Sequence, residues 1–320
     1  MARSGQDHSP QLVLGIETSC DDTGVAVVDG ARRIRAEKVI SQNALHAAYG
    51  GIVPEIAARA HVTRLDALIA EVMTEAGLGW ADLDAFAVTS GPGLIGGLVV
   101  GTVTARTLAS VFAKPVIGIN HLEAHALTAR LTDDLPFPYL LLLVSGGHCQ
   151  LLSVEGLGDY RRLGTTIDDA LGEAFDKVAK LFDLGFPGGP AVERAARNGD
   201  ASRFDFPRPL AGKPGCHFSF SGLKTAVRRE IERIGPANID DQTIADLCAS
   251  FQAAAFDTVI ERTGRAIRQF HTQHPQACHL VVAGGVAANQ ALARVLKTLA
   301  ERHGMTLVVP PARLCTDNGV

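Results

Sequence analysis

The chain has few features of a disulfide or zinc-ribbon protein. No C-x-x-C pair occurs anywhere in its 320 residues. The absence of this pair argues against a zinc ribbon or a dithiol redox motif, and it favours free thiols in a reducing compartment. The six cysteines are scattered, at Cys20, Cys149, Cys216, Cys248, Cys278 and Cys315.

The sequence also lacks a secretion signal and a long apolar run. Residues 1–11 are polar and contain no apolar core of the kind that a signal peptide needs, so we expect a disordered polar leader there. Gly or Thr interrupts the longest apolar stretches, which therefore predict core elements and no membrane span of about 20 residues. These features predict a cytoplasmic protein that does not contact a membrane.

An excess of positive charge is missing as well. The formal net charge is −4, and no long basic run is present. Because such a field repels phosphate, any nucleic acid must be bound by a local patch. At 47% hydrophobic and 20% charged residues, the composition fits a globular α/β protein.

The length of the chain favours two domains, because 320 residues exceed one typical core. A polar, Pro-rich joint at residues 132–138 suggests where they meet. We therefore predict an N-terminal domain at residues 12–134 and a C-terminal domain with a helical insertion at residues 135–320. Residues 316–320 resemble a helix start, so we also expect the chain to be truncated at its C-terminus.

Two segments look like copies of one unit. Residues 12–29 and 140–154 each contain an apolar strand, a tight turn and a second apolar strand, followed by a third strand. This duplication predicts an α/β fold of the actin-like, sugar-kinase-like and Hsp70-like type, with two domains around a nucleotide cleft. Other expected strands lie at 34–40, 85–89, 115–119, 160–163, 278–283 and 305–309, and expected helices at 54–76, 94–112, 169–182, 188–198, 221–234 and 239–271.

Glycine-rich turns end two of the expected strands. Ser145-Gly146-Gly147 lies in the second hairpin, and Gly284-Gly285 follows residues 278–283. Backbone N–H groups of such turns and of helix N-termini bind anions. A tight turn without a ligand is the ordinary alternative for each. Together they predict an adenine nucleotide between the two domains.

A histidine pair offers metal ligands. On a helix His121 and His125 point the same way, and they follow residues 115–119, which predict a buried strand. The pair would open a helix at the carboxyl end of that strand, where α/β folds place ligands. Leu122 stands where a metalloprotease H-E-x-x-H motif has its Glu, so no such base is present. Two helix-surface histidines without a metal are the alternative.

Further motifs occur in a fixed order, and together they carry a resemblance. The motifs are IETSCDDT at 16–23, YGGIVPE at 49–55, SGPGL at 90–94, HLEAH at 121–125, LVSGGH at 143–148, DDALGEAFDK at 168–177, PGGP at 187–190, FSFSGLK at 218–224, AGGVAAN at 283–289 and CTDNG at 315–319. With these motifs, the chain from residue 12 to the last residue closely resembles the bacterial TsaD family (also YgjD or Gcp), the tRNA N6-adenosine threonylcarbamoyltransferases.

The resemblance implies an acyl transfer. A threonylcarbamoyl group passes from threonylcarbamoyl-AMP to the N6 amine of the adenosine 3′ of the anticodon, in tRNAs that read codons starting with A, and AMP leaves. It also implies one divalent metal on His121, His125 and Asp317, where an N-terminal helix cap is the alternative for Asp317. Two imidazoles and a carboxylate leave open positions, which favours Fe²⁺ and also permits Zn²⁺. Such a metal acts as a Lewis acid.

The same resemblance assigns ligand contacts. The turn that contacts substrate and phosphate corresponds to Leu143, Val144, Ser145, Gly146 and Gly147. Asp176 and Glu193 match positions at the ribose hydroxyls, and Gly189 and Asn289 match contacts to nucleoside and base. A helix-surface role is the alternative for Glu193.

Asp21 and Asp22 are the candidate catalytic carboxylates, in the first hairpin turn at the mouth of the cleft. They could accept a proton from the attacking amine or orient it. Many family members have Asp-Glu there, so the shorter Asp22 puts the reach of this carboxylate in question. A turn-capping role is the alternative for Asp21.

Two other functions stay open at this point. A kinase or ATPase of the actin-like fold would not need the His–His–Asp set, and a non-catalytic partner subunit like the family's inactive paralogue would lack the histidine pair. The resemblance implies tRNA, a TsaB-like paralogue and a TsaE-like ATPase as partners, and a homodimer is a further option.

Two helices are candidates for a dimer contact. They span residues 94–112 and residues 54–76, and the second of these presents Ile56, Ala57, Ala60, Val72 and Met73. The candidate tRNA contacts are basic residues that Glu230 and Glu232 interrupt, namely Arg203, Arg208, Lys213, Lys224, Arg228, Arg229 and Arg233.

Overall fold

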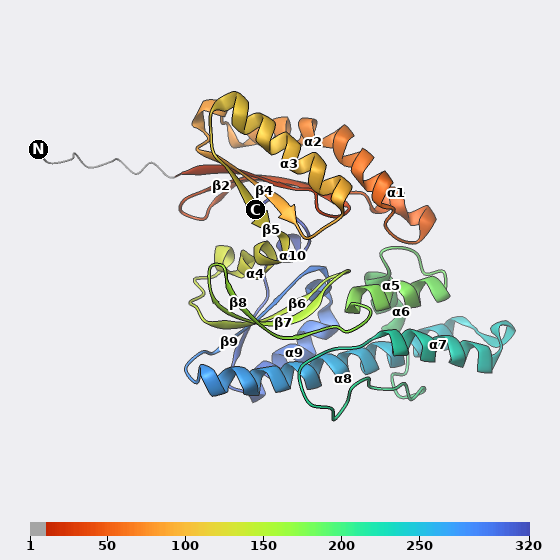
Figure 1. The fold of residues 1–320 in the computed structure, drawn as a ribbon. Helices are drawn as coiled ribbons and strands as arrows, with labels where there is room; N and C mark the ends of the chain where they lie inside the picture. Colours follow the sequence, from red (N-terminus) through yellow and green to blue (C-terminus); the bar gives the residue numbers. More distant parts are fainter. Residues whose placement is uncertain (1–10) are drawn as a thin grey trace, which may run out of the picture. The chain divides into compact units, whose positions relative to one another are not determined.

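The computed structural model describes residues 11–320 (Figure 1). The predicted leader, residues 1–11, therefore falls almost wholly outside the described residues. The chain packs as two units, of which unit 1 is Met1–His46, Ile52–Ala124 and Asp317–Val320, and unit 2 is Ala47–Gly51 and His125–Thr316. These units are defined by which residues pack together, whereas the predicted domains are segments of the sequence. The predicted domain boundary after residue 134 therefore stays a prediction.

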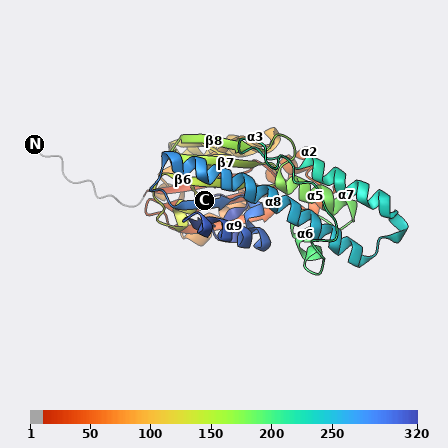
Figure 2. The ribbon, with the colours of Figure 1, turned by 90° about the horizontal axis from the view of Figure 1, so that it is seen from below.

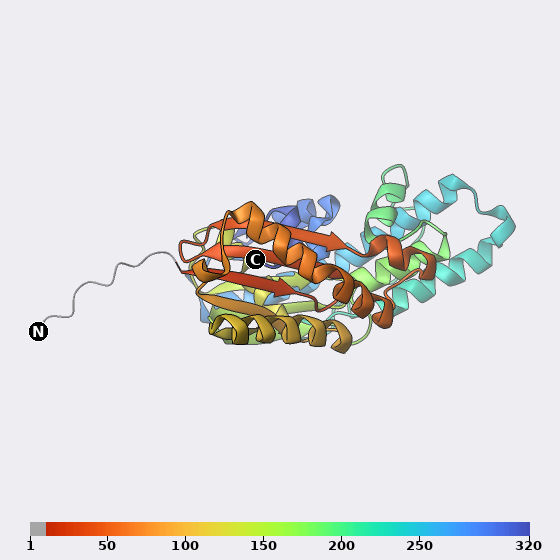
Figure 3. The same ribbon diagram turned by 90° about the horizontal axis from the view of Figure 1, so that it is seen from above.

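Unit 1 is built on a five-stranded sheet. The strand order is β3-β2-β1-β4-β5, in which the first three strands are antiparallel and β1, β4 and β5 are parallel. Helices α2 (Pro54–Ala76) and α3 (Ile95–Phe112) lie over one face of this sheet (Figure 3). The strands are β1 (Leu12–Glu17), β2 (Asp22–Asp29), β3 (Ile34–Ser41), β4 (Ala85–Gly91) and β5 (Val116–Asn120), with short helices α1 (Asn43–His46), η1 (Ala47–Tyr49) and η2 (Trp80–Asp82).

Unit 2 repeats this plan. Its sheet has the order β10-β9-β6-β7-β8, again with an antiparallel trio (β6, β7, β8) and a parallel trio (β6, β9, β10). The strands are β6 (Tyr139–Val144), β7 (Cys149–Gly156), β8 (Asp159–Thr165), β9 (His279–Ala283) and β10 (Thr306–Val308). Because the two sheets share one strand order, the predicted duplication is confirmed.

Helices cover the second sheet and form the helical insertion. The long helix α8 (Asp241–Gln273) packs on β6, β7 and α9 (Gln290–Arg302) (Figure 2). Asp240 caps α8 by accepting a hydrogen bond from the backbone N–H of Thr243 at 2.8 Å. The other helices are α4 (His121–Thr132), α5 (Leu171–Leu181), α6 (Gly188–Ala196), α7 (Ser221–Ile234), α10 (Ala312–Cys315), η3 (Pro236–Asn238) and η4 (Gly285–Ala288).

Local sequence signals explain where several elements begin and end. Pro54 opens α2 in the first helical turn, where no N–H is needed, and Gly77 ends it with a φ of 67°. Both α2 and α7 have the predicted bounds. Residues 316–320 are not helical and follow the short helix α10, and the predicted helix start there stays a prediction.

Helix α3 connects the parallel neighbours β4 and β5, and it packs mainly on β4. By length and composition this helix, alone among residues 11–320, could cross a membrane, and 28% of it is buried. Two strands of one sheet hold its two ends, so it is the crossover of a β-α-β unit. The prediction that this stretch is a core element holds for one face only, because Ile95, Val99, Val103 and Val111 are 50–76% exposed.

Strand β5 corrects another prediction. Residues 115–119 were expected to form a buried strand, and the strand is present, but Val116 and Ile117 are 38% and 48% exposed. The reason is its place at the edge of the sheet, where β4 is its only strand neighbour. An apolar run cannot distinguish an edge strand from a central one.

Three glycines let two pieces of backbone touch in unit 1. A Cβ atom on Gly15 of β1 would lie 2.0 Å from the carbonyl oxygen of Gly319, and one on Gly24 of β2 would lie 2.8 Å from the Gly319 nitrogen. A Cβ on Gly319 would in turn lie 2.6 Å from the backbone of Val25 and Ala26. Residues 318–319 therefore lie directly on the β1–β2 hairpin.

We expect Gly15→Ala to lower the free energy of unfolding by about 1–3 kcal/mol, because the added methyl group must push Gly319 away. Urea unfolding measures this change. Gly222→Ala is the matched control, since a Cβ there meets nothing within 4 Å and its position in α7 favours alanine. Equal stability of Gly15→Ala and the wild type would contradict the packing.

Candidate functional site

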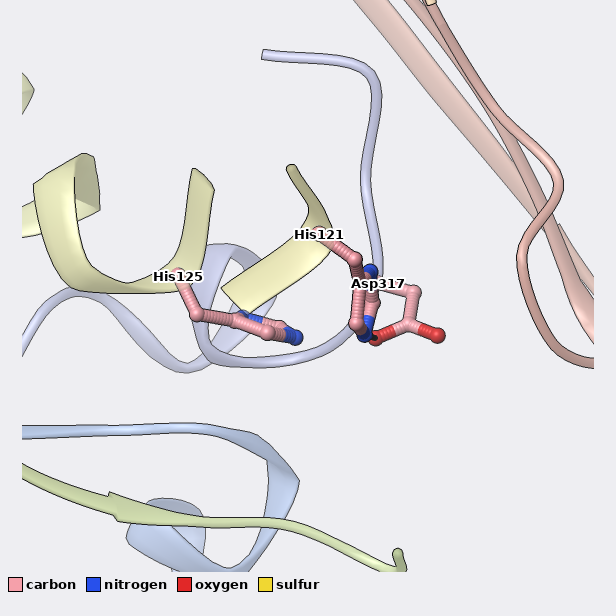
Figure 4. Close-up of side chains that lie close together, drawn as sticks. All are labelled: His121, His125 and Asp317. Atoms are coloured by element: carbon pink, nitrogen blue, oxygen red, sulfur yellow. Dashed lines mark ion pairs between the residues drawn. The ribbon is translucent and has the colours of Figure 1, made fainter. Parts of the chain in front are cut away.

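Helix α4 begins at the first histidine of the pair. The side chain of Asn120 accepts hydrogen bonds from the backbone N–H groups of Leu122 (2.9 Å) and Glu123 (3.3 Å), which caps the helix. His121 is thus the first residue of α4, and His125 follows one turn later on the same side (Figure 4). Both are nearly buried, at 7% and 5% exposed. The predicted helix start is confirmed.

Asp317 joins the two histidines. One ligand atom of each residue lies within 4.8 Å of the others, and Nε2 of His121 is 3.7 Å from Oδ1 of Asp317 (Figure 4). Metal bonds of about 2.0–2.2 Å place ligand atoms roughly 3–4 Å apart, so a small closure would suit a divalent cation. Two imidazole nitrogens and one carboxylate oxygen are ligands that Fe²⁺ and Zn²⁺ accept.

A buried carboxylate lies behind His121. Glu17, the last residue of β1, is 3% exposed, and its Oε2 lies 3.2 Å from Nδ1 of His121. Burial disfavours the protonated imidazole, but the hydrogen bond with Glu17 and the charge of Asp317 together raise the pKa of His121. Sequence reasoning missed Glu17, although an acidic residue at the end of an apolar strand was a signal for it.

Asp21 and Asp22 lie at the start of β2 and are partly buried. Burial, with a smaller effect from the charge of Asp317, raises the pKa of Asp21. Burial and the neighbouring carboxylates of Asp21 and Asp317 raise the pKa of Asp22 to about 7. A carboxyl group with a pKa near neutrality is suited to accept a proton. The same burial and the charges of Asp21 and Asp317 also raise the pKa of the Cys20 thiol, which makes this cysteine a poor nucleophile.

A buried histidine network holds this turn, and the sequence analysis missed it. His61 of α2 is fully buried, with Nε2 3.0 Å from the carbonyl oxygen of Cys20 and Nδ1 2.7 Å from the hydroxyl of Thr23. The carbonyl can only accept, so Nε2 carries the hydrogen and Nδ1 accepts from Thr23. Gln42 and His46 extend the network to the chain before α2. Its neutral histidine places Cys20, and therefore Asp21.

In unit 2 the glycine-rich turn is tightly held. The N–H of Ser145 donates to the carbonyl of His148 (2.8 Å), and the N–H of His148 donates to the Ser145 hydroxyl (3.0 Å). A Cβ on Gly172 of α5 would lie 2.7–3.0 Å from the backbone of residues 145–146, so α5 presses on the turn. A Cβ on Gly146 or Gly147 would meet no atom within 4 Å. These two exposed glycines leave room for a ligand.

Comparison with known proteins agrees with this geometry. The profile of the TsaD family, described as tRNA N6-adenosine threonylcarbamoyltransferase, matches residues 33–320. A protein of that name from Methylobacterium sp. (strain 4-46) is 61% identical over 313 residues, which are 96% of this chain and 89% of the relative.

The chain belongs to the TsaD family.

Solved structures show the fold alone. HypF, solved in a phosphate- and nucleotide-bound form, matches with a TM-score of 0.59 at 13% identity over 98% of this chain and 45% of HypF. The activator of 2-hydroxyisocaproyl-CoA dehydratase from Clostridium difficile, solved with ADPNP, matches with a TM-score of 0.54 at 15% identity over 95% of this chain and 91% of the activator. These likenesses confirm the predicted actin-like duplicated α/β fold.

Three polar residues that the TsaD resemblance assigns to the ligand form hydrogen bonds with helix N-termini of unit 2. Asp176 accepts a hydrogen bond from the N–H of Gly188 at the start of α6 (2.7 Å). Glu193 accepts from the N–H of Gln290 (3.0 Å), and Asn289 caps the same helix, α9, through the N–H of Leu292 (2.9 Å). Each therefore has a structural role, and ligand contact stays a prediction for each.

Leu143, Val144 and Gly189 are the other residues that were predicted to contact the ligand, and they differ in their exposure. Leu143 and Val144 are fully buried in β6, so their side chains are closed to a ligand and they act by placing Ser145. Gly189, in the first turn of α6, is half-buried, and a Cβ there would meet nothing within 4 Å. Close approach of a ligand to its backbone is therefore compatible with the structure.

Most of the candidate tRNA contacts are occupied by carboxylates. Arg203 pairs with Asp246 (2.7 Å), and Arg208 pairs with Asp257 (2.9 Å). On α7, Arg228 lies 3.5 Å from Glu232, and Arg233 lies 2.6 Å from Glu230. The acidic interruptions seen in the sequence thus pair with two of the seven basic candidates, and Asp246 and Asp257 pair with two more. The other candidates are Lys213, Lys224 and Arg229.

We expect one divalent metal ion per chain in the wild type and none in the His121→Ala/His125→Ala double variant, because only one ligand of the cluster remains. Elemental analysis of the dialysed, folded proteins gives the ratio. Affinity should also weaken below about pH 6, as the imidazoles protonate. Stoichiometric metal in the folded double variant would exclude this centre.

His61 should make stability depend on pH. Burial lowers its pKa from the ordinary value of 6.5, so below that pH protons bind the unfolded chain more readily. The free energy of unfolding should then fall as pH decreases from 6.5 towards the folded-state pKa, by at most about 1.4 kcal/mol per pH unit from this residue.

Urea unfolding between pH 7 and pH 5 measures that slope. His61→Gln should reduce it, because the replacement does not titrate. Thr258→Val is the control, since it removes a buried hydroxyl in unit 2 that does not contact His61 and should destabilise the protein at every pH without changing the slope. An unchanged slope in a folded His61→Gln protein would refute the assignment.

Proposed function

We propose that this chain transfers the threonylcarbamoyl group of threonylcarbamoyl-AMP to the N6 amine of the adenosine 3′ of the anticodon, in tRNAs that read codons starting with A. The observation that carries the proposal is the His121, His125 and Asp317 cluster in a chain 61% identical to a tRNA N6-adenosine threonylcarbamoyltransferase. A kinase would not need this cluster, and the inactive paralogue lacks the histidines. The tRNA substrate also supports a cytoplasmic location.

The three ligands would hold one divalent cation, with Fe²⁺ favoured and Zn²⁺ as the alternative. A cation there supplies Lewis-acid stabilisation of negative charge, and the reaction requires no redox change. The attacking N6 amine forms a bond to the carbamoyl carbon while the bond from that carbon to the phosphate oxygen breaks. AMP leaves with the bonding electrons.

Unit 1 would handle the proton that N6 must lose. Asp22 is the better candidate base, because burial and its acidic neighbours raise its pKa to about 7. Asp21 would orient the amine, since the His61 network fixes the backbone directly before it. A nearby cation would favour the ionised form of both carboxylates, which keeps them available as acceptors.

Unit 2 would bind the AMP part of the donor. The Ser145-Gly146-Gly147 turn offers open backbone for the phosphate, Gly189 and Asn289 would contact the nucleoside, and Gly284-Gly285 would lie beside them. Asp176 and Glu193 would accept from the ribose hydroxyls while keeping their helix caps, because an ionised carboxylate accepts up to about four hydrogen bonds.

The direct test is an assay with purified protein, threonylcarbamoyl-AMP and tRNA, followed by nucleoside analysis. Gly146→Val should fold, since its Cβ meets no protein atom within 4 Å, but its side chain fills the space expected for the phosphate. We expect AMP affinity by calorimetry to fall at least about tenfold, the effect of losing roughly 1.4 kcal/mol. Gly222→Val serves as the control and should bind AMP normally. Wild-type affinity in Gly146→Val would count against this phosphate site.

We further propose that activity on tRNA depends on a TsaB-like paralogue and a TsaE-like ATPase. The exposed side chains of Ile95, Val99 and Val103 recur every four residues along α3, which gives one apolar stripe that is exposed among residues 11–320. Of the predicted dimer residues on α2, Ala57, Val72 and Met73 belong to the core of unit 1, so that part of the prediction is wrong. A homodimer on the α3 stripe is the alternative.

Val99→Glu/Val103→Glu should abolish association with the TsaB-like partner, because charges would be buried in an apolar contact. Mass photometry measures association, and the tRNA assay with and without partners measures dependence. Leu157→Glu is the control, since Leu157 is 71% exposed in unit 2. Full turnover by a monomeric, partner-free wild-type protein would refute the dependence.

A further inference from the structure

A buried carboxylate beside a metal-ligating histidine is the feature that the proposed function does not use. Glu17 is 3% exposed, and taking an ionised carboxylate out of water is costly unless donors surround it. Three donor groups do so. The backbone N–H of Ser19 donates to Oε1, the hydroxyl of Thr89 donates to Oε2 at 2.5 Å, and Nδ1 of His121 lies 3.2 Å from Oε2.

These contacts determine which nitrogen of His121 carries the hydrogen. An ionised carboxylate can only accept, so Nδ1 is the donor, and the hydroxyl of Ser19, 3.1 Å from the same nitrogen, can accept from it as well. In a neutral imidazole the lone pair is then on Nε2. That is the nitrogen 3.7 Å from Oδ1 of Asp317, on the side of the other ligand atoms.

The position of Glu17 is itself rigid. Its donors come from β4 and from the chain after β1, and β1 pairs directly with β4. Side chains two apart on a strand share a face, so Glu17 and Gly15 point the same way. Residues 318–319 rest on Gly15, which means that β1 supports His121 through Glu17 and the segment bearing Asp317 through Gly15.

We infer that Glu17 is a positioning residue for the metal centre, which holds His121 with hydrogen on Nδ1 and with Nε2 turned toward the cation. The inference rests on the proposed function for the cation itself. The hydrogen on Nδ1 is inferred separately, from the contacts of that nitrogen with Glu17 and Ser19. Hydrogen bonds to the outer nitrogen of a ligating histidine commonly affect metal affinity by about 10–100-fold.

Glu17→Gln is the sharpest variant, because it keeps the shape and changes one oxygen to an N–H donor. The N–H of Ser19 requires the amide oxygen, which turns the amide nitrogen toward His121. Nδ1 must then accept, and the hydrogen moves to Nε2, where it blocks metal binding. We expect Co²⁺ and Zn²⁺ dissociation constants, measured by competition with a chromophoric chelator, to rise about 10–100-fold.

A second measurement reports the tautomer without metal. Long-range ¹H–¹⁵N spectra of protein labelled with ¹⁵N-histidine should show His121 with hydrogen on Nδ1 in the wild type and on Nε2 in Glu17→Gln. The signal is assigned by its absence from His121→Asn. Glu155→Gln is the matched control, because Glu155 pairs with His274 at 3.0 Å in unit 2, and it should change neither the His121 signal nor metal affinity.

The outcomes separate the two claims. If the wild type binds no Co²⁺ or Zn²⁺, the proposed metal centre fails, while an unchanged His121 tautomer in Glu17→Gln overturns the role of Glu17. Wild-type affinity in folded Glu17→Gln also overturns it. Should Glu17→Gln not fold, Glu17→Asp replaces it. The shorter carboxylate keeps the charge but loses contact with Nδ1, so affinity should still fall, and an unchanged affinity would refute the inference.

Discussion

The contact of residues 318–319 with the β1–β2 hairpin is the constraint on which the candidate metal centre depends. Gly15, Gly24 and Gly319 meet backbone to backbone, and no other residue type leaves room for that contact. It brings Asp317 within 3.7 Å of His121, although 196 positions separate them in the chain, as their numbers show. Without this contact, the conformational entropy of the segment would oppose the placement of the Asp317 carboxylate.

The same hairpin also carries the groups proposed for proton transfer. Asp21 and Asp22 lie where the chain passes from β1 into β2, and Asp317 contributes to the raised pKa of both. Three carboxylates that repel one another in a partly buried turn store unfavourable electrostatic energy. A divalent cation on the histidine pair would relieve it. The cluster is thus arranged to favour a cation by charge as well as by ligand geometry.

Unit 2 contains several backbone positions that could bind an anion, and they differ in the charge of their neighbours. Helix N-termini attract phosphate, but Asp176 already bonds to the start of α6, and Glu193 and Asn289 bond to the start of α9. The negative charges of Asp176 and Glu193 make the starts of α6 and α9 unfavourable positions for a phosphate. The turn at Ser145 bonds instead to backbone groups of His148, Gly172 and Glu173, and its two glycines are exposed. Charge therefore favours the turn as the phosphate site, with the acidic caps closer to hydroxyl groups.

How far the sequence could predict this arrangement depends on the range of each interaction. Local signals were enough for α2, with Pro54 and Gly77, and for the histidine pair, whose helical spacing alone aligns the two rings. Ordered motifs shared with a known family supplied Asp317. Glu17 and His61 escaped because their roles come from partners far away in sequence, such as Thr89 and Cys20. Hydrophobic periodicity likewise could not tell that β5 lies at a sheet edge, which only the strand order decides.

The charged residues of the helical insertion bear on how tRNA could bind. Ion pairs between exposed side chains contribute little to stability, about 0–1 kcal/mol, so the pairs of Arg208, Arg228 and Arg233 are weak as structural contacts. Arg203 differs, because its partner Asp246 is buried. The main effect of these pairs is on the field, because each arginine brings its own counter-charge. A tRNA phosphate would have to displace a carboxylate at each of them, whereas Lys213, Lys224 and Arg229 offer too few charges for tight binding. An acidic chain of this kind can hold the reacting adenosine in a shaped site, while the affinity for the rest of the tRNA has to come from another surface. That requirement agrees with the apolar stripe on α3, which is exposed among residues 11–320.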